Sequence, residues 1–313
     1  MSEHFADRLL QRIANKGAAV CVGIDPVYEM LPDVIAGAPP SRDPGDFEAA
    51  VDAIFEFTTA VIRIVAPHVP CVKFQSACFE KYLWEGVESY YSLIQEAEAM
   101  DLLVIGDVKR GDIGTTAAAY AEAHLADPPY ENLDDIVLPD AITVNPYMGM
   151  DTLEPFVAAA RAYGKGLFVV VRSSNPGSAD LQDAKLEDGR TFCEMLADRL
   201  REVASSPGLV GDSGYSAVGA VVGATQPHTM TSLRQRLPQS IFLLPGYGAQ
   251  GATAEMTRAA FVRGQGAIVS ASRSILYAYR DPRYASRFGE DWQKCIEQAV
   301  LDMKREVAAV AAS

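Results

Sequence analysis

Acidic and basic side chains alternate where one apolar run of the sequence ends. The run 102–110 carries Asp107 and Lys109 near its end, and Asp112 follows after it. Neighbouring side chains of a β-strand point to opposite faces, so Asp107 and Lys109 share a face if this run is a strand. Asp112 lies beyond the run, and the alternation does not fix its direction. The pattern predicts a carboxylate and an ammonium in contact, with a second carboxylate in the loop that follows.

A second lysine joins this group if the apolar runs are neighbouring strands of a barrel. Lys73 lies near the end of the preceding run, 69–75, where it can meet Asp107. Alternating charges keep lysines protonated and aspartates ionised, which is unfavourable for a Schiff-base lysine. The arrangement suits electrostatic catalysis, in which a fixed ammonium stabilises a developing carbanion and then donates its proton. An ordinary salt-bridge network is the alternative interpretation.

Residues suited to binding an anion follow the last two apolar runs. Segment 245–251 combines glycines with Gln250, and segment 270–274 contains Arg273. α/β barrels often bind phosphate in the loops after strands seven and eight, and arginine holds phosphate through two parallel hydrogen bonds. These loops predict a phosphate site. A glycine-rich turn beside a surface arginine is the alternative.

Other polar side chains close the first and fifth runs. Asp25, in the sequence GIDP, is an acceptor suited to a sugar hydroxyl, although it would also serve as a helix cap. Ser173 and Ser174 offer hydroxyl groups for the edge of a heterocycle.

Eight short runs rich in Val, Ile and Ala must position these residues. Their apolarity is continuous rather than alternating, which is typical of parallel strands covered on both faces. The gaps between runs leave room for helices, so the sequence predicts an α/β fold, a (β/α)8 TIM barrel, as a single domain over 1–313. An open doubly wound sheet is disfavoured because no GxGxxG motif follows the first run. The runs are 18–26, 69–75, 102–110, 141–149, 166–174, 217–225, 241–248 and 266–273.

Helices are expected between these strands, together with two longer inserts. The insert 31–46 leads into a helix, and the insert 176–188 follows the fifth run, where it forms a lid or pocket edge or else a plain surface loop. The expected helices span 45–65, 86–99, 115–125, 151–162, 189–203, 252–263 and 290–311.

Composition excludes several classes of protein. The formal net charge of −14 gives no general attraction to nucleic acid or to an anionic membrane surface. No apolar stretch approaches the length of a transmembrane helix, and the first residues form an amphipathic pattern instead of a signal peptide, so a cytoplasmic protein is expected. The scattered cysteines and four histidines show no metal-ligand spacing, and no metal site is expected.

Five motifs in order resemble the orotidine 5′-phosphate decarboxylase family, and most of all its longer bacterial subgroup. They are VKFQ, DVKRGDIGTT, SSNPG, LLPGYGAQG and SRS, and the resemblance extends over nearly the whole chain. It implies a homodimeric barrel enzyme without cofactor or metal that converts orotidine 5′-monophosphate to UMP and CO2 in pyrimidine biosynthesis. The carbanion left at C6 of the ring is then protonated by Lys109.

The resemblance also implies a role for each matching residue. The catalytic array falls on Lys73, Asp107, Lys109 and Asp112, the last of them supplied across the dimer interface. Ile113 and Thr116 likewise reach the partner's site. The implied substrate-binding residues are Asp25 with Lys73 for the ribose, Ser174 or its neighbour Ser173 for the pyrimidine, and Gln250 and Arg273 for the phosphate.

Two other functions remain as alternatives. Metal-dependent phosphosugar decarboxylases and synthases have a similar third strand, but they carry an acidic metal ligand where this chain has Lys73. A non-catalytic nucleotide-binding protein on the same barrel is the other alternative, against which the intact charge array counts.

Overall fold

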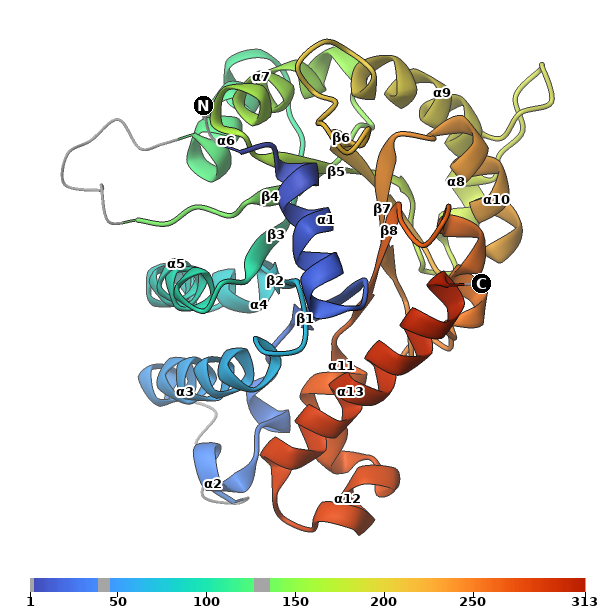
Figure 1. Cartoon of the computed structure of the whole chain (residues 1–313). Helices are drawn as coiled ribbons and strands as arrows, with labels where there is room; N and C mark the ends of the chain where they lie inside the picture. The colour runs from blue at the N-terminus through green and yellow to red at the C-terminus, as the bar shows by residue number, and fades with distance from the viewer. Residues whose placement is uncertain (1–2, 39–45, 127–135, 313) are drawn as a thin grey trace.

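Eight parallel strands close into a barrel in the order of the sequence (Figure 1). The computed structural model describes residues 3–38, 46–126 and 136–312. Each apolar run of the sequence overlaps one strand, which confirms the predicted (β/α)8 fold. The strands are β1 Val20–Ile24, β2 Cys71–Gln75, β3 Leu103–Arg110, β4 Ala141–Val144, β5 Gly166–Arg172, β6 Ser216–Val222, β7 Ser240–Pro245 and β8 Ala267–Ala271.

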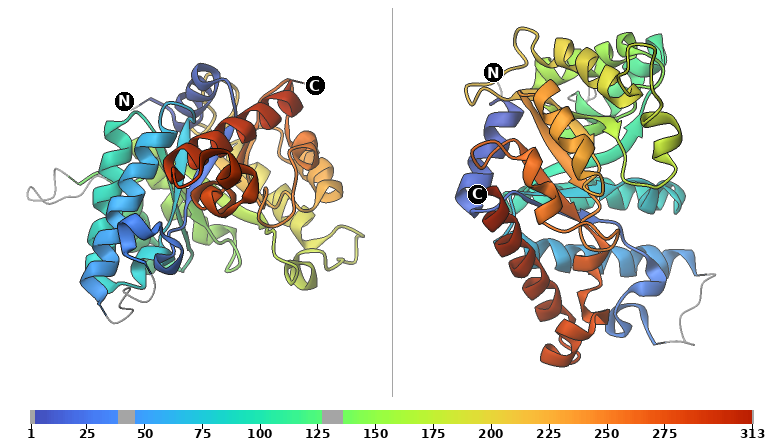
Figure 2. Two further views of the ribbon diagram at one scale, coloured as in Figure 1. Left: turned by 90° about the horizontal axis from the view of Figure 1, so that it is seen from below. Right: turned by 90° about the vertical axis from the view of Figure 1, so that its right-hand side faces the viewer.

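The helices surround this barrel (Figures 1 and 2). Both faces of the strands are therefore covered, and every residue of β6 is buried, which explains why the runs are continuously apolar. The main helices are α1 Phe5–Lys16, α3 Phe47–Val65, α5 Leu83–Ala99, α6 Gly114–Leu125, α7 Glu154–Tyr163, α9 Phe192–Ala204, α10 Pro227–Arg236 and α13 Trp292–Ala311.

Shorter helices lie in the connections. They are α2 Asp33–Ala36, α4 Ala77–Glu80, α8 Ser178–Gln182, α11 Arg273–Leu276 and α12 Pro282–Phe288, with 3-10 turns η1 Tyr28–Met30, η3 Met150–Leu153, η4 Glu255–Ala260 and η5 Ala278–Arg280.

Helix α1 covers the amino-terminal end of the barrel (Figure 1). Phe5 is buried and meets the ring of Phe168 edge to face, with 6.0 Å between the centroids. It packs so closely on Gly166, the first residue of β5, that a Cβ there would lie 2.2 Å from its ring. With this end closed, the carboxyl ends of the strands remain as the place for a site.

One predicted helix is wrong in type. The segment 252–263 forms only the 3-10 turn η4, which ends at Ala260. Thr257 donates its hydroxyl hydrogen bond to the carbonyl of Ala254, and the backbone takes positive φ at Arg263 just beyond. Both features favour a short tight turn over a continued α-helix.

The two inserts differ in how far they are described. Residues 31–38 contain α2, whereas 39–45 lie outside the described residues. The insert 176–188 is described throughout and contains α8. Among the described helices, none is long and apolar enough to cross a membrane.

Candidate active site

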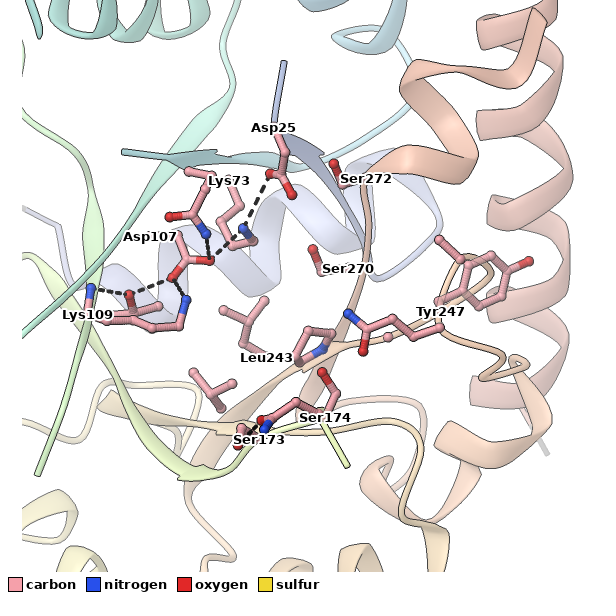
Figure 3. A pocket seen from close by; sticks show the side chains of 18 of the residues that line it. Asp25, Lys73, Asp107, Lys109, Ser173, Ser174, Leu243, Tyr247, Ser270 and Ser272 are labelled. Atoms are coloured by element: carbon pink, nitrogen blue, oxygen red, sulfur yellow. Dashed lines mark hydrogen bonds and ion pairs between the residues drawn. The ribbon is translucent and has the colours of Figure 1, made fainter. Parts of the chain in front are cut away.

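A pocket of about 280 Å³ lies at the carboxyl ends of the strands (Figure 3). Its wall combines polar residues from β1, β2, β3 and β4 on one side with the loops after β5, β7 and β8 on the other. Most of the predicted site residues line it: Asp25, Lys73, Asp107, Lys109, Ser174, Gln250 and Arg273.

Four charged side chains alternate in sign along one wall of the pocket (Figure 3). Lys73 Nζ lies 2.7 Å from Asp107 Oδ2, and Lys109 Nζ lies 2.5 Å from Asp107 Oδ1. Asp25 Oδ1 extends the row at 3.8 Å from Lys73 Nζ. Lys73 and Asp107 are buried, whereas the side chain of Lys109 is 49% exposed and reaches into the open part of the pocket.

These contacts keep the buried pair charged. Burial by itself raises the pKa of Asp107, but the charges of Lys73 and Lys109 outweigh it and hold that pKa well below its ordinary value. Burial lowers the pKa of Lys73, yet the carboxylates of Asp107 and Asp25 outweigh it and raise that pKa above the usual range. Lys73 and Asp107 therefore both stay charged at neutral pH.

Two further residues hold Asp107, and the sequence analysis missed both. Thr143 on β4 donates to Asp107 Oδ1 at 2.8 Å, and Gln75 on β2 donates to Asp107 Oδ2 at 3.2 Å. Each carboxylate oxygen of Asp107 thus accepts from one lysine and one neutral donor. Gln75 ends the run 69–75, and Thr143 is a polar residue within the run 141–149. A polar residue in an apolar strand next to β3 was the available signal.

The backbone of β3 departs from regular strand geometry at Lys109. This residue has φ +43°, a value unusual for a residue with a side chain, and the pairing with β4 shifts register between Gly106 and Arg110. The Lys109 amide donates to Thr143 Oγ1 at 3.0 Å. A single hydroxyl group thus contacts both the strained backbone of Lys109 and the carboxylate of Asp107.

The loop after β5 separates the roles of the two serines. The amide, carbonyl and hydroxyl of Ser173 all form hydrogen bonds within the protein. Ser174 also lines the pocket, and its hydroxyl has no hydrogen-bond partner within the described residues (Figure 3). Ser174 is the serine of this pair with a free hydroxyl for a ligand.

The loops after β7 and β8 form the other end of the pocket. Glycines with positive φ, Gly246 and Gly248, turn the chain there, and no ion pair to Arg273 occurs in the part of the chain that the structure describes. Tyr247 donates to Glu306 Oε2 on α13 at 2.6 Å and so ties this loop to the last helix.

Two buried oxygens at the same pocket lack hydrogen-bond partners in the described residues. They are Asp25 Oδ1 and Ser272 Oγ. Buried polar atoms are rarely left without hydrogen-bond partners, so both oxygens are available to a polar ligand in the pocket.

Three predicted residues lie outside this pocket. Asp112 Oδ1 accepts from the amide of Ile113 at 2.8 Å, the side chain of Ile113 is 63% exposed, and Thr116 on α6 is exposed. One chain by itself does not bring them to the charged array.

The donor set of the pocket does not resemble a metal centre. Across residues 3–38, 46–126 and 136–312, no group of three or more histidine, cysteine, aspartate or glutamate side chains is placed to hold a metal ion. The ammonium group of Lys73 stands between Asp25 and Asp107, where a cation bound by both carboxylates would have to lie.

Comparison with known proteins places the chain in a family. The family model described as orotidine 5′-phosphate decarboxylase / HUMPS family matches residues 19–287. The chain belongs to this family. Proteins named orotidine 5′-phosphate decarboxylase from Rhodopirellula baltica and Caldicellulosiruptor bescii are each 39% identical to it. They align over 97% and 98% of this chain, and in both cases over 98% of the relative.

Solved structures agree with this family assignment. A Streptomyces avermitilis protein superimposes with a TM-score of 0.78 at 31% identity, covering all of this chain and 97% of that one. Leishmania donovani OMP decarboxylase gives a TM-score of 0.71 at 29% identity, with 99% of this chain and 100% of that chain covered. The family members therefore share the whole barrel, including the strands that carry the charged array.

Proposed function

We propose that the protein is an orotidine 5′-phosphate decarboxylase, which converts orotidine 5′-monophosphate to UMP and CO2 in pyrimidine biosynthesis. The observation that carries the proposal is the contact of Asp107 with both Lys73 and Lys109 in the pocket of a chain from this family. Lys73 stands where a metal-dependent phosphosugar enzyme would need an acidic ligand, so the same contact favours decarboxylation of the nucleotide.

The charged array supplies the chemistry. The bond between C6 of the ring and the carboxyl group breaks, CO2 leaves, and the electron pair stays on C6. Asp107, kept ionised by its contacts, faces the departing carboxylate, while the ammonium of Lys109 stabilises the carbanion and transfers a proton from Nζ to C6. Since both charges are fixed before the substrate binds, no reorganisation is needed during the step.

The other pocket residues arrange the nucleotide around this array. Gln250 and Arg273 bind the phosphate, Asp25 and Lys73 bind the ribose hydroxyl groups, and Ser174 binds the edge of the pyrimidine. The unpaired Asp25 Oδ1 supports the ribose assignment. Binding energy from the phosphate, remote from C6, then helps to hold the ring against the charges.

We further propose that the active enzyme is a homodimer with shared sites. Three predicted site residues lie outside the pocket of their own chain, namely Asp112, Ile113 and Thr116. In a homodimer, they complete the pocket of the second copy. The loop after β4 packs on Gly111 through Asn145, and it carries the exposed side chains of Tyr147 and Met148. With the exposed Ile113, these side chains offer apolar surface for such an interface.

In this proposal, residues 1–313 form a single domain and the protein is located in the cytoplasm. A single hydrophobic cluster extends from Phe5 to Val310. All five cysteines are free thiols, as expected of a protein in a reducing compartment.

The decisive experiment measures CO2 release from orotidine 5′-monophosphate by the purified protein, with and without EDTA. We expect turnover that the chelator leaves unchanged, and a loss of at least about 10³-fold for Lys109→Ala with the thermal transition preserved. Absence of CO2 release refutes the proposal. Activity that EDTA abolishes points instead to the metal-dependent phosphosugar enzymes.

A further inference from the structure

A fully buried arginine stands behind the serine loop of the pocket. Arg172, the last residue of β5, is 0% exposed. Its Nη1 donates to the carbonyl of Ser173 at 2.9 Å and also to the hydroxyl of Ser178, and its Nη2 donates to Asp183 Oδ2 at 2.9 Å. Arg172 thus joins the serine loop to α8 and to the residue that follows this helix.

Gln182, the last residue of α8, completes the connection. Its Oε1 accepts from the Ser173 amide at 2.8 Å and from Arg172 Nη1 at 3.2 Å, and its Nε2 donates to Ser173 Oγ at 3.1 Å. Ser173 Oγ also donates to Asn175 Oδ1 at 2.8 Å. The amide, carbonyl and hydroxyl of Ser173 therefore all take part in hydrogen bonds within the protein.

Residues that follow β6 contact Ser174, the next residue of the serine loop. Thr225 donates to the carbonyl of Ser174 at 3.3 Å. The loop lies so close to Gly223 that a Cβ there would be 2.8 Å from the Cα of Ser174. Ser174 is held between α8 and the end of β6, with its hydroxyl turned to the pocket (Figure 3).

We propose that Arg172 and Gln182 are positioning residues that hold Ser173–Asn175 as a preformed wall for the ring of the nucleotide. The insert 176–188 then supports this wall from behind, and through Gln182 it affects how strongly the base is recognised. This inference rests on the proposed function, because it assigns the base to this wall. Preorganised donors bind a ligand more tightly because little order is lost on binding.

The test compares binding of UMP with binding of ribose 5-phosphate, which lacks the base, by titration calorimetry. Gln182→Met keeps the length of the side chain and removes its hydrogen bonds. We expect it to weaken UMP binding about tenfold, the effect of one to two lost hydrogen bonds. Binding of ribose 5-phosphate should stay within about twofold of the wild type, since its contacts lie at the other loops.

Two further variants make the result specific. Gln182→Glu keeps acceptor oxygens for Arg172 and for the Ser173 amide, so it should restore UMP binding to within about threefold of the wild type. Asp180→Ala, on the exposed side of the same helix, should change neither ligand. Ribose 5-phosphate binding and the thermal transition report that each variant is folded.

The outcomes separate this inference from the proposed function. Equal weakening of both ligands by Gln182→Met, or no weakening of UMP, overturns the positioning role. Wild-type protein that releases no CO2 from orotidine 5′-monophosphate instead overturns the proposed function on which the inference rests.

Discussion

At the scale of single residues, the site depends on how completely Asp107 is bound. Its carboxylate oxygens accept hydrogen bonds from two lysines and two neutral donors. These contacts offset the free-energy cost of burying its charge. The alternation along 102–110 correctly predicted the contact between Asp107 and Lys109. Both side chains line the pocket, although the backbone at Lys109 has positive φ and the pairing with β4 is irregular there.

Thr143 offers a test at this scale. Thr143→Val keeps the shape of the side chain and removes both its hydrogen bond to Asp107 and its acceptor for the Lys109 amide. We expect kcat to fall about 10- to 100-fold, the effect of losing a hydrogen bond to a charged group, while KM changes less than about threefold. Steady-state kinetics with orotidine 5′-monophosphate measures both.

The matched control for this change is Thr143→Ser. It restores the hydroxyl group and should recover most of kcat, although it removes a buried methyl group and lowers stability somewhat. If the valine variant keeps kcat within twofold of the wild type, Thr143 does not position the charged pair.

At the scale of elements, the strands of the barrel were more predictable than the loops that follow them. The eight strands followed from continuous apolarity, and the predicted helices 45–65 and 290–311 correspond to α3 and α13. The prediction of a helix over 252–263 is wrong, because this segment forms only the short 3-10 turn η4. Contacts between elements distant in sequence, such as Tyr247 with Glu306, were not predictable from local pattern.

The contact between the β7 loop and α13 leads to a second prediction. Glu306→Ala removes the acceptor that holds Tyr247 and so loosens the loop that carries Gln250. We expect KM to rise about two- to fivefold with kcat nearly unchanged, because ordering the loop then costs binding energy. Kinetics at varied substrate concentration separates the two constants.

A neighbour on the same helix provides the comparison. Arg305→Ala alters an exposed side chain that pairs only with Asp302 among the described residues, and it should leave KM at the wild-type value. A rise in KM for Arg305→Ala equal to that for Glu306→Ala would show a general effect of α13 and not the contact with Tyr247.

At the scale of the whole molecule, an acidic chain must bind an anionic nucleotide. With a net charge of −14, it cannot rely on a general positive field. In the proposed function, binding therefore depends on local groups such as Arg273 and on donors in the loops. Asp112 lies outside the pocket of its own chain. In the proposed homodimer, it completes the site of the second copy, so that groups of two chains surround one substrate.

Subunit mixing tests this assembly. Asp112→Ala and Lys109→Ala are each expected to be nearly inactive. In a mixed dimer, one site combines the intact Lys109 of one chain with the intact Asp112 of the other. Random exchange at equal amounts makes about half of the dimers mixed, so about a quarter of wild-type activity should return. Proven subunit exchange without any recovery would contradict the shared site.

Five sequence motifs carried the resemblance to the family, while the pattern of the sequence by itself determined the barrel and the clustering of Lys73, Asp107 and Lys109. These depend on short-range periodicity and on the rule that the carboxyl ends of parallel strands meet at one end of a barrel. Only the tertiary structure decided that Thr143 and Gln75 hold Asp107. Only it showed that the hydroxyl of Ser173 is hydrogen-bonded within the protein, whereas that of Ser174 has no hydrogen-bond partner among the described residues. Those assignments depend on strand register and loop packing between residues 36, 32 and 9 positions apart. A hydrogen bond is lost over shifts of about an ångström, and the local pattern of residue types does not specify the register so finely.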